Sequence, residues 1–220
     1  MSKHFALLLI VALLLGAQPG SIGEEMSLGT AALTLRAMGF EIDYDMLAEI
    51  ADEWEIDLER VKAMGVGELL DCMGNGHYNW QTYKWTPISH QVYAFDVEVF
   101  DISNMYTLCL QGIQAIVPDV VISDVREDLS GLDDNLEGLR SVSFLCNGHP
   151  YSVELESLGD WCNAAFFDFM DRVLEAERCP CRLYRFLGDG QSCIVVYNTE
   201  AFARSLEQFD LYLLTPEDGF

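Results

Sequence analysis

Ser141–Glu156 reads SVSFLCNGHPYSVELE, and this stretch indicates the fold class more clearly than any other part of the chain. Apolar and polar residues alternate on both sides of Asn147-Gly148, a dipeptide that tolerates the positive φ angles of a tight hairpin turn. Strands Ser141–Cys146 and Tyr151–Glu156 are therefore predicted to pair as an antiparallel hairpin.

The segments after this hairpin continue the same alternation of strands and helices. A helix with a large apolar face is predicted from an Asp160 cap to Glu177, followed by a second hairpin made of residues 182–187 and 192–197. Thr199 caps a last helix, and a short strand follows it. The whole pattern predicts an α+β fold with a mostly antiparallel sheet that carries helices on one face.

The segments before the hairpin predict a strand, a helix and a helical region. Residues 91–101 are apolar on both faces, which predicts a central strand, and Ser103 is expected to cap the helix that follows. Apolar residues at helical spacing from Ser27 to Gly74 predict three or four short helices, whose acidic residues between Glu41 and Glu59 should face water. We expect a helical N-terminal region at 26–76 and an α+β domain at 88–215.

The start of the chain has the pattern of a secretory signal peptide over residues 1–20. Lys3 precedes a short apolar run, Ala6–Ala17, that ends in small residues and is too short to span a bilayer. The prediction is a secreted or cell-envelope protein. An uncleaved leader that anchors the chain in the membrane, and a cytoplasmic protein translated from Met26, are the alternatives.

The charge of the chain limits the classes of partner. Its 36 acidic and 12 basic residues give a formal net charge of −24, and no basic stripe is present. Such a chain repels phosphate groups at long range, which argues against nucleic acid and anionic membrane surfaces as partners. A protein, peptide or carbohydrate ligand is compatible with this charge.

Cysteine chemistry supplies one functional hypothesis. Cys162 is expected two residues after the cap of a helix, where the helix dipole favours a thiolate, with His149 as base and Asp160 as orienting group. Cys72 with His149 and either Asp160 or Asn163 is a second arrangement of the same kind. Both would make the chain a cysteine-dependent hydrolase or acyl-transfer enzyme with papain-like or transglutaminase-like chemistry.

A pair of carboxylates and a loop rich in aromatic residues supply the other hypotheses. Asp96-Val-Glu98 resembles the paired acids of two-metal nucleases, but the acidic chain does not suit a polyanionic substrate, so no metal or cofactor is predicted. The loop after Gly76 carries polar-tipped rings of the kind found in ligand sites, at Tyr78, Trp80, Tyr83 and Trp85. The alternative is that these rings form a lid over the core.

The aromatic loop is the strongest functional candidate and decides the functional prediction. We expect a non-catalytic binding or interaction module that contacts its ligand through Tyr78, Trp80, Tyr83 and Trp85. The cysteine-dependent enzyme is the alternative.

Overall fold

The computed structural model describes residues 28–79, 81–82, 84–188, 191–215 and 218. The predicted leader and the loop residues Trp80 and Tyr83 lie outside this part of the chain, so the exported location stays a prediction. Within the described ranges, no helix combines the length and apolar character needed to cross a membrane.

The described residues form seven α-helices, nine strands and two short 3₁₀ turns, with the strands in three antiparallel sheets. The α+β class predicted from the sequence is confirmed. In chain order the elements are α3 (Thr30–Ala37), α4 (Tyr44–Glu53), α5 (Leu58–Lys62), α6 (Val66–Asn75), β1 (His77–Asn79), β2 (Lys84–Thr86), β3 (Val92–Asp96), α7 (Met105–Ile116), β4 (Ile122–Asp128), β5 (Leu139–Cys146), β6 (His149–Glu156), α8 (Ala165–Ala176), β7 (Arg182–Leu187), β8 (Ser192–Asn198), α9 (Glu200–Leu206) and β9 (Tyr212–Leu213).

The chain divides into two compact units, with the boundary between Ala63 and Met64. The first contains α3, α4 and α5, and α4 begins at an Asp43 cap whose carboxylate accepts the Met46 N–H at 2.8 Å. The acidic residues from Glu41 to Glu59 are all exposed, as predicted.

Helix α6 belongs to the second unit, although we expected it in the N-terminal helical region. The reason is its close packing on β3, where a Cβ added to Gly74 would lie 2.5 Å from the backbone nitrogen of Ala94. Only a residue without a side chain allows the helix to approach the strand so closely.

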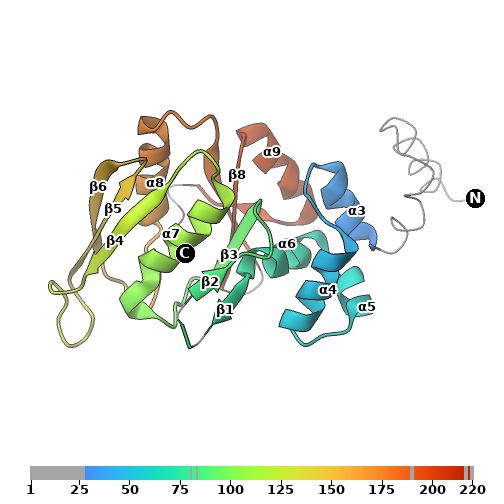
Figure 1. The fold of residues 1–220 in the computed structure, drawn as a ribbon, viewed down its shortest axis with the longest axis horizontal. Coiled ribbons are helices and arrows are strands. Elements are labelled where there is room, and N and C mark those ends of the chain that lie inside the picture. Colours follow the sequence, from blue (N-terminus) through green and yellow to red (C-terminus); the bar gives the residue numbers. More distant parts are fainter. Residues whose placement is uncertain (1–27, 80, 83, 189–190, 216–217, 219–220) are drawn as a thin grey trace, which may run out of the picture. The chain divides into compact units, whose positions relative to one another are not determined.

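Strand β3 lies at the edge of its sheet, so its predicted central position is wrong. The strand order is β3-β8-β7-β9, yet four of the five β3 residues are buried. Helix α6 covers the Ala94 face, and α7 covers the opposite face, where Gly112 lies against the Tyr93 ring. Burial on both faces therefore comes from helices rather than from neighbouring strands, as Figure 1 shows.

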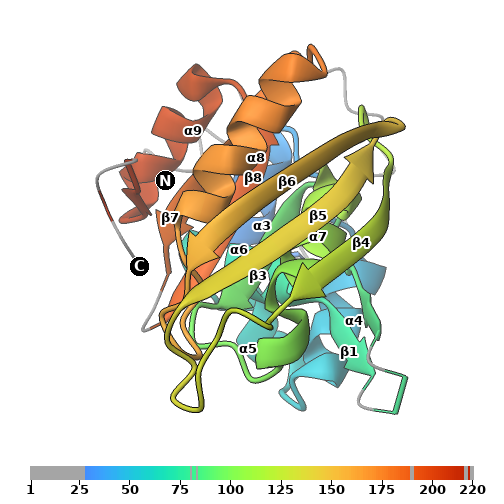
Figure 2. The same cartoon turned by 90° about the vertical axis from the view of Figure 1, so that its left-hand side faces the viewer.

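The hairpin predicted at residues 141–156 is confirmed as β5 and β6. Cys146 pairs with His149 across a two-residue turn, and Asn147 and Gly148 both adopt positive φ angles, of 51° and 83°. Strand β4 completes a three-stranded sheet whose inner face packs on α7 and α8 (Figure 2). This sheet has the helix-covered single face that the sequence predicts.

Two predicted helix starts are wrong. Asp160 does not cap α8, which begins at Ala165, because the preceding backbone bonds to the segment after β3: Val99 N–H donates to the Asp160 carbonyl and Cys162 N–H to the Val97 carbonyl. Ser103 lies within a 3₁₀ turn, Ile102–Asn104, and α7 starts after it.

Candidate functional site

A cavity of about 250 Å³ lies between β3 and α7, beside the β1–β2 hairpin of the second unit. Its walls are mainly apolar and aromatic, and we refer to it as the aromatic pocket. The described residues that line it are Asn75, Tyr78, Trp85, Tyr93, Ala94, Phe95, Asp96, Glu98, Val99, Phe100, Met105, Leu108 and Cys109. The size is just below the range of about 300–1,000 Å³ usual for small-molecule sites, so it suits a compact ligand.

The rings of the aromatic pocket support one another through edge and stacked contacts. Trp85 meets Tyr93 edge-on with 5.4 Å between ring centroids, and its indole N–H donates to the Asn75 carbonyl at 2.5 Å. Tyr93 stacks on Phe95 at 5.3 Å. These contacts fix the ring positions before any ligand arrives.

Tyr78 and Phe100 form a second pair of rings in the aromatic pocket. Their centroids lie 4.8 Å apart at an interplanar angle of 75°. Phe100 is 58% exposed, a large value for a phenylalanine, so the pocket presents aromatic surface to water.

Two carboxylates, Asp96 and Glu98, line the aromatic pocket and are exposed. Asp96 Oδ1 accepts the Glu98 N–H at 2.9 Å, and Glu98 Oε2 accepts the side-chain amide of Gln191 at 2.9 Å. A carboxylate has about four acceptor positions, so each of these groups keeps the capacity to bind a further donor. None of the described residues that line the pocket is Lys, Arg or His.

The structure brings together two of the four rings predicted as the contact surface. Tyr78 and Trp85 both line the aromatic pocket, while Trp80 and Tyr83 lie outside the described residues. Tyr93, Phe95 and Phe100 also line the pocket, although their alternating positions in the sequence predict only the second face of a strand. Asp96-Val-Glu98 resembles a metal-binding pair of carboxylates in the sequence, but the described residues beside it on the pocket lining are mainly aromatic and apolar.

Cys162 is fully buried rather than exposed at a helix terminus. Burial raises the pKa of its thiol, and a hydrogen bond with the neighbouring Cys109 adds to the shift, with Cys193 also close. Across the described residues, no three His, Cys, Asp or Glu side chains are arranged to hold a metal ion. A buried thiol with a raised pKa has little thiolate and does not act as a nucleophile.

His149 is exposed and forms a hydrogen bond with Glu177. The distance from His149 Nδ1 to Glu177 Oε1 is 2.9 Å, and the His149 side chain is 71% exposed. The Tyr151 hydroxyl and the Asn147 amide also donate to Glu177, and these bonds, with Tyr151 the largest contributor, lower the pKa of this carboxyl. The arrangement anchors the end of α8 to the hairpin turn.

The structure does not bring Cys162, His149 and Asp160 together. His149 starts β6, whereas Glu156 ends it, and Asn163 beside Cys162 donates its amide to the Glu156 carbonyl at 3.0 Å. Eight strand residues span roughly 23 Å, so the thiol and the imidazole lie at opposite ends of β6. The second arrangement has no support either, because Cys72 is buried in α6.

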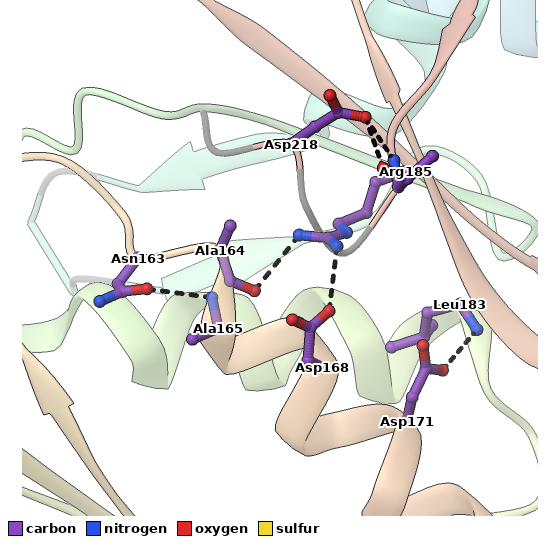
Figure 3. A network of polar contacts seen from close by, with 9 residues as sticks. Asn163, Ala164, Ala165, Asp168, Asp171, Leu183, Arg185 and Asp218 are labelled. Atoms are coloured by element: carbon purple, nitrogen blue, oxygen red, sulfur yellow. Dashed lines mark hydrogen bonds and ion pairs between the residues drawn. The ribbon is translucent and has the colours of Figure 1, made fainter.

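Two arginines of the second unit are buried, and each lies between a carboxylate and an aromatic ring. Arg185 donates to Asp168 at 3.0 Å and to the Ala164 carbonyl at 3.2 Å (Figure 3). Its guanidinium lies 5.7 Å from the Phe167 ring centroid. Arg140 lies 3.5 Å from Glu127 and 5.5 Å from the Tyr106 ring centroid.

The first unit repeats this arrangement at its surface. Lys62 bonds to Glu59 at 2.8 Å and lies 5.3 Å from the centroid of the Tyr44 ring. We call the three sets, centred on Arg140, Arg185 and Lys62, the cation–ring–carboxylate clusters.

A wider depression of about 910 Å³ lies within the first unit, between α4 and the start of α5. Its lining contains Asp52, Glu55, Asp57 and Arg60 and no aromatic ring. It is an open, solvated surface without convergent groups, and we prefer the aromatic pocket as the candidate site.

Comparison with known proteins adds no assignment: no family model, curated protein or solved structure matches this chain.

Proposed function

We propose that the protein is a non-catalytic binding module whose ligand occupies the aromatic pocket. The observation that carries this proposal is a cavity with ring faces contributed by three different segments, β1–β2, β3 and the loop that contains Phe100. Pockets with apolar walls and a few polar groups at the rim are the usual form of small-molecule sites.

The packing around the pocket supports a preformed site. The Tyr93 ring contacts Trp85 of β2 and Phe95 of β3, and it lies against Gly112 of α7. A ligand that meets rings already in place loses less binding free energy to the ordering of side chains. The expected ligand is a compact group with an aromatic or aliphatic body.

The proposal is tested with three phenyl compounds of similar size: 2-phenylethylamine, 2-phenylethanol and 3-phenylpropanoate. Saturation-transfer NMR and calorimetry measure their binding to the wild-type protein and to Leu108→Trp. Leu108 lines the pocket, so the larger side chain should fill it and weaken binding about 10-fold or more.

Leu139→Trp is the matched control, because Leu139 is 53% exposed at the start of β5 and does not line the pocket. Its binding should equal that of the wild type, and thermal unfolding confirms that both variants are folded. If none of the three compounds binds, or if Leu108→Trp binds them as the wild type does, the proposed function is wrong.

A further inference from the structure

We infer that the ligand of the aromatic pocket is a small organic cation, an ammonium group on a short apolar body. This inference rests on the proposed function and adds the charge of the ligand. It follows from a comparison of the pocket with the three cation–ring–carboxylate clusters.

Each cation–ring–carboxylate cluster combines the same two partners. A positive charge is attracted by the face of an aromatic ring and by a carboxylate at the same time, and the two attractions point to one position. Arg140, Arg185 and Lys62 each occupy such a position, within 5.3 to 5.7 Å of a ring centroid.

The aromatic pocket contains both partners of these clusters. Tyr78, Trp85 and Phe100 provide rings, and Asp96 and Glu98 provide carboxylates on the same lining. No cation of the chain is among the described lining residues. A bound ammonium would contact a ring and a carboxylate in the pocket, as Arg140, Arg185 and Lys62 do in the cation–ring–carboxylate clusters.

Charge favours a cationic ligand over the other ligand classes for this lining. An anionic ligand would meet two carboxylates on a chain of net charge −24, where like charges repel. A neutral ligand would leave the carboxylates with water and their own hydrogen bonds, and would gain nothing from their charge. A bare metal ion needs more oxygen ligands than the two carboxylates offer beside apolar rings. An ammonium with an apolar stem satisfies the rings and the carboxylates together.

The size of the cavity favours a small molecule over a long chain. A volume of about 250 Å³ accommodates one ring and a short stem, as in 2-phenylethylamine. The exposed position of Asp96 and Glu98 places the charged end of such a molecule toward solvent and its ring toward Tyr93 and Phe95.

The test compares 2-phenylethylamine with 2-phenylethanol, which has the same shape and no charge, by calorimetry at about pH 7, where the amine is protonated. In the wild type the amine should bind about 3- to 10-fold more tightly than the alcohol. The double variant Asp96→Asn/Glu98→Gln should reduce this ratio to about 1. Asp133→Asn/Glu154→Gln, with acids that do not line the pocket, should keep the wild-type ratio.

The outcomes separate this inference from the proposed function. If the alcohol and the amine bind equally to the wild type, and both lose affinity in Leu108→Trp, the proposed binding function is supported. The inference that the ligand is a cation is then wrong. If the ratio of amine to alcohol affinity is the same in Asp96→Asn/Glu98→Gln as in the wild type, the inference of a cationic ligand is also wrong. If a blocked Phe-Lys dipeptide binds and free 2-phenylethylamine does not, the ligand is a peptide and the inference of a small organic cation is wrong.

Discussion

Glu127 and the pair Asp96 and Glu98 are carboxylates beside aromatic rings, but among the residues that the structure describes only Glu127 of these three has a cation of the chain beside it. Its side chain is 3% exposed and lies beside Arg140, and it also accepts the backbone and hydroxyl donors of Thr107 at the start of α7. Asp96 and Glu98 are exposed on the lining of an open cavity.

The difference shows how one set of chemical groups can serve stability in one region and binding in another. Where the cation belongs to the chain and is buried, the cluster joins secondary-structure elements, as Glu127 joins β4 to β5 and α7. Where the cation is absent from the described lining, the same groups are available to a ligand. Variants in the two regions should therefore affect different measurements.

The largest effect is expected from Arg140→Ala. The substitution leaves Glu127 buried without its positive partner, and removing one member of a buried pair typically lowers the free energy of unfolding by about 3–5 kcal/mol. Burial already raises the pKa of Glu127 despite Arg140 and its hydrogen bonds, so the carboxylate is poorly solvated there. Urea unfolding measures the loss, and amine binding by the folded fraction should not change.

Two variants control for this interpretation. Arg140→Met/Glu127→Gln removes both charges and should lose much less stability than Arg140→Ala. Arg182→Ala breaks an exposed pair with Glu175, whose side chains are 56% and 68% exposed, and should cost about 0–1 kcal/mol. Equal losses from Arg140→Ala and Arg182→Ala would contradict the structural role of the buried cluster.

The next largest effect is expected from Phe100→Ala, and it should appear in binding. Loss of one ring beside a cation should reduce the affinity for 2-phenylethylamine about 2- to 30-fold, the equivalent of about 0.5–2 kcal/mol. Tyr212→Ala is the matched control, since Tyr212 is also 58% exposed and lies outside the pocket. Calorimetry that found the same affinity for both variants would remove Phe100 from the binding surface.

A smaller effect is expected from salt. Exposed charges are screened strongly in about 1 M salt and weakly in about 0.01 M salt, so the affinity for 2-phenylethylamine should fall between these conditions. The affinity for 2-phenylethanol should not fall, since its binding is apolar. A parallel salt response of the two compounds would contradict a contact between the amine and the exposed carboxylates.

The smallest effect concerns Glu177, a carboxylate that the chain supplies with neutral donors and His149. Its pKa is lowered in the folded state, chiefly by the Tyr151 hydroxyl, so its contribution to stability is present above the unfolded value of 4.5 and is lost as pH falls through the folded value. The free energy of unfolding of Glu177→Gln should therefore lie further below that of the wild type at about pH 6 than at about pH 3.

Glu154→Gln is the control for this pH dependence, because Glu154 is exposed on β6. Urea unfolding across the pH range measures both variants. If the difference in the free energy of unfolding between Glu177→Gln and the wild type is constant with pH, the hydrogen bonds of Glu177 do not depend on its ionisation.

Local patterns in the sequence predicted much of this fold. The Asn147-Gly148 turn and its flanking alternation fixed the register of β5 and β6, and the Thr199 hydroxyl accepts the Phe202 N–H as a cap should. In both cases the deciding interactions lie within a few residues of one another, so tertiary packing had little to overrule.

The errors concern features that depend on distant parts of the chain. The apolar faces of β3 predict neighbouring strands, yet α6 and α7 cover them. Asp160 has the chemistry of a helix cap, but its backbone is bonded to Val99. A single sequence does not show which partner a buried backbone segment will find.

The candidate site was partly predictable for the same reason. Tyr78 and Trp85 lie on one hairpin and could be grouped from the sequence, whereas the wall formed by Leu108 and Cys109 depends on where α7 docks. Cys162 and His149 failed as a pair because the length of β6 separates them.

The contact between Gly112 and the Tyr93 ring constrains how this protein can change during evolution. A Cβ at position 112 would lie 2.4 Å from the ring, which no rotation of the tyrosine on a fixed strand relieves easily. Lineages that keep the aromatic wall must keep the glycine, and those that lose the ring are free to replace it. Covariation of these two positions would therefore mark which descendants retain the pocket.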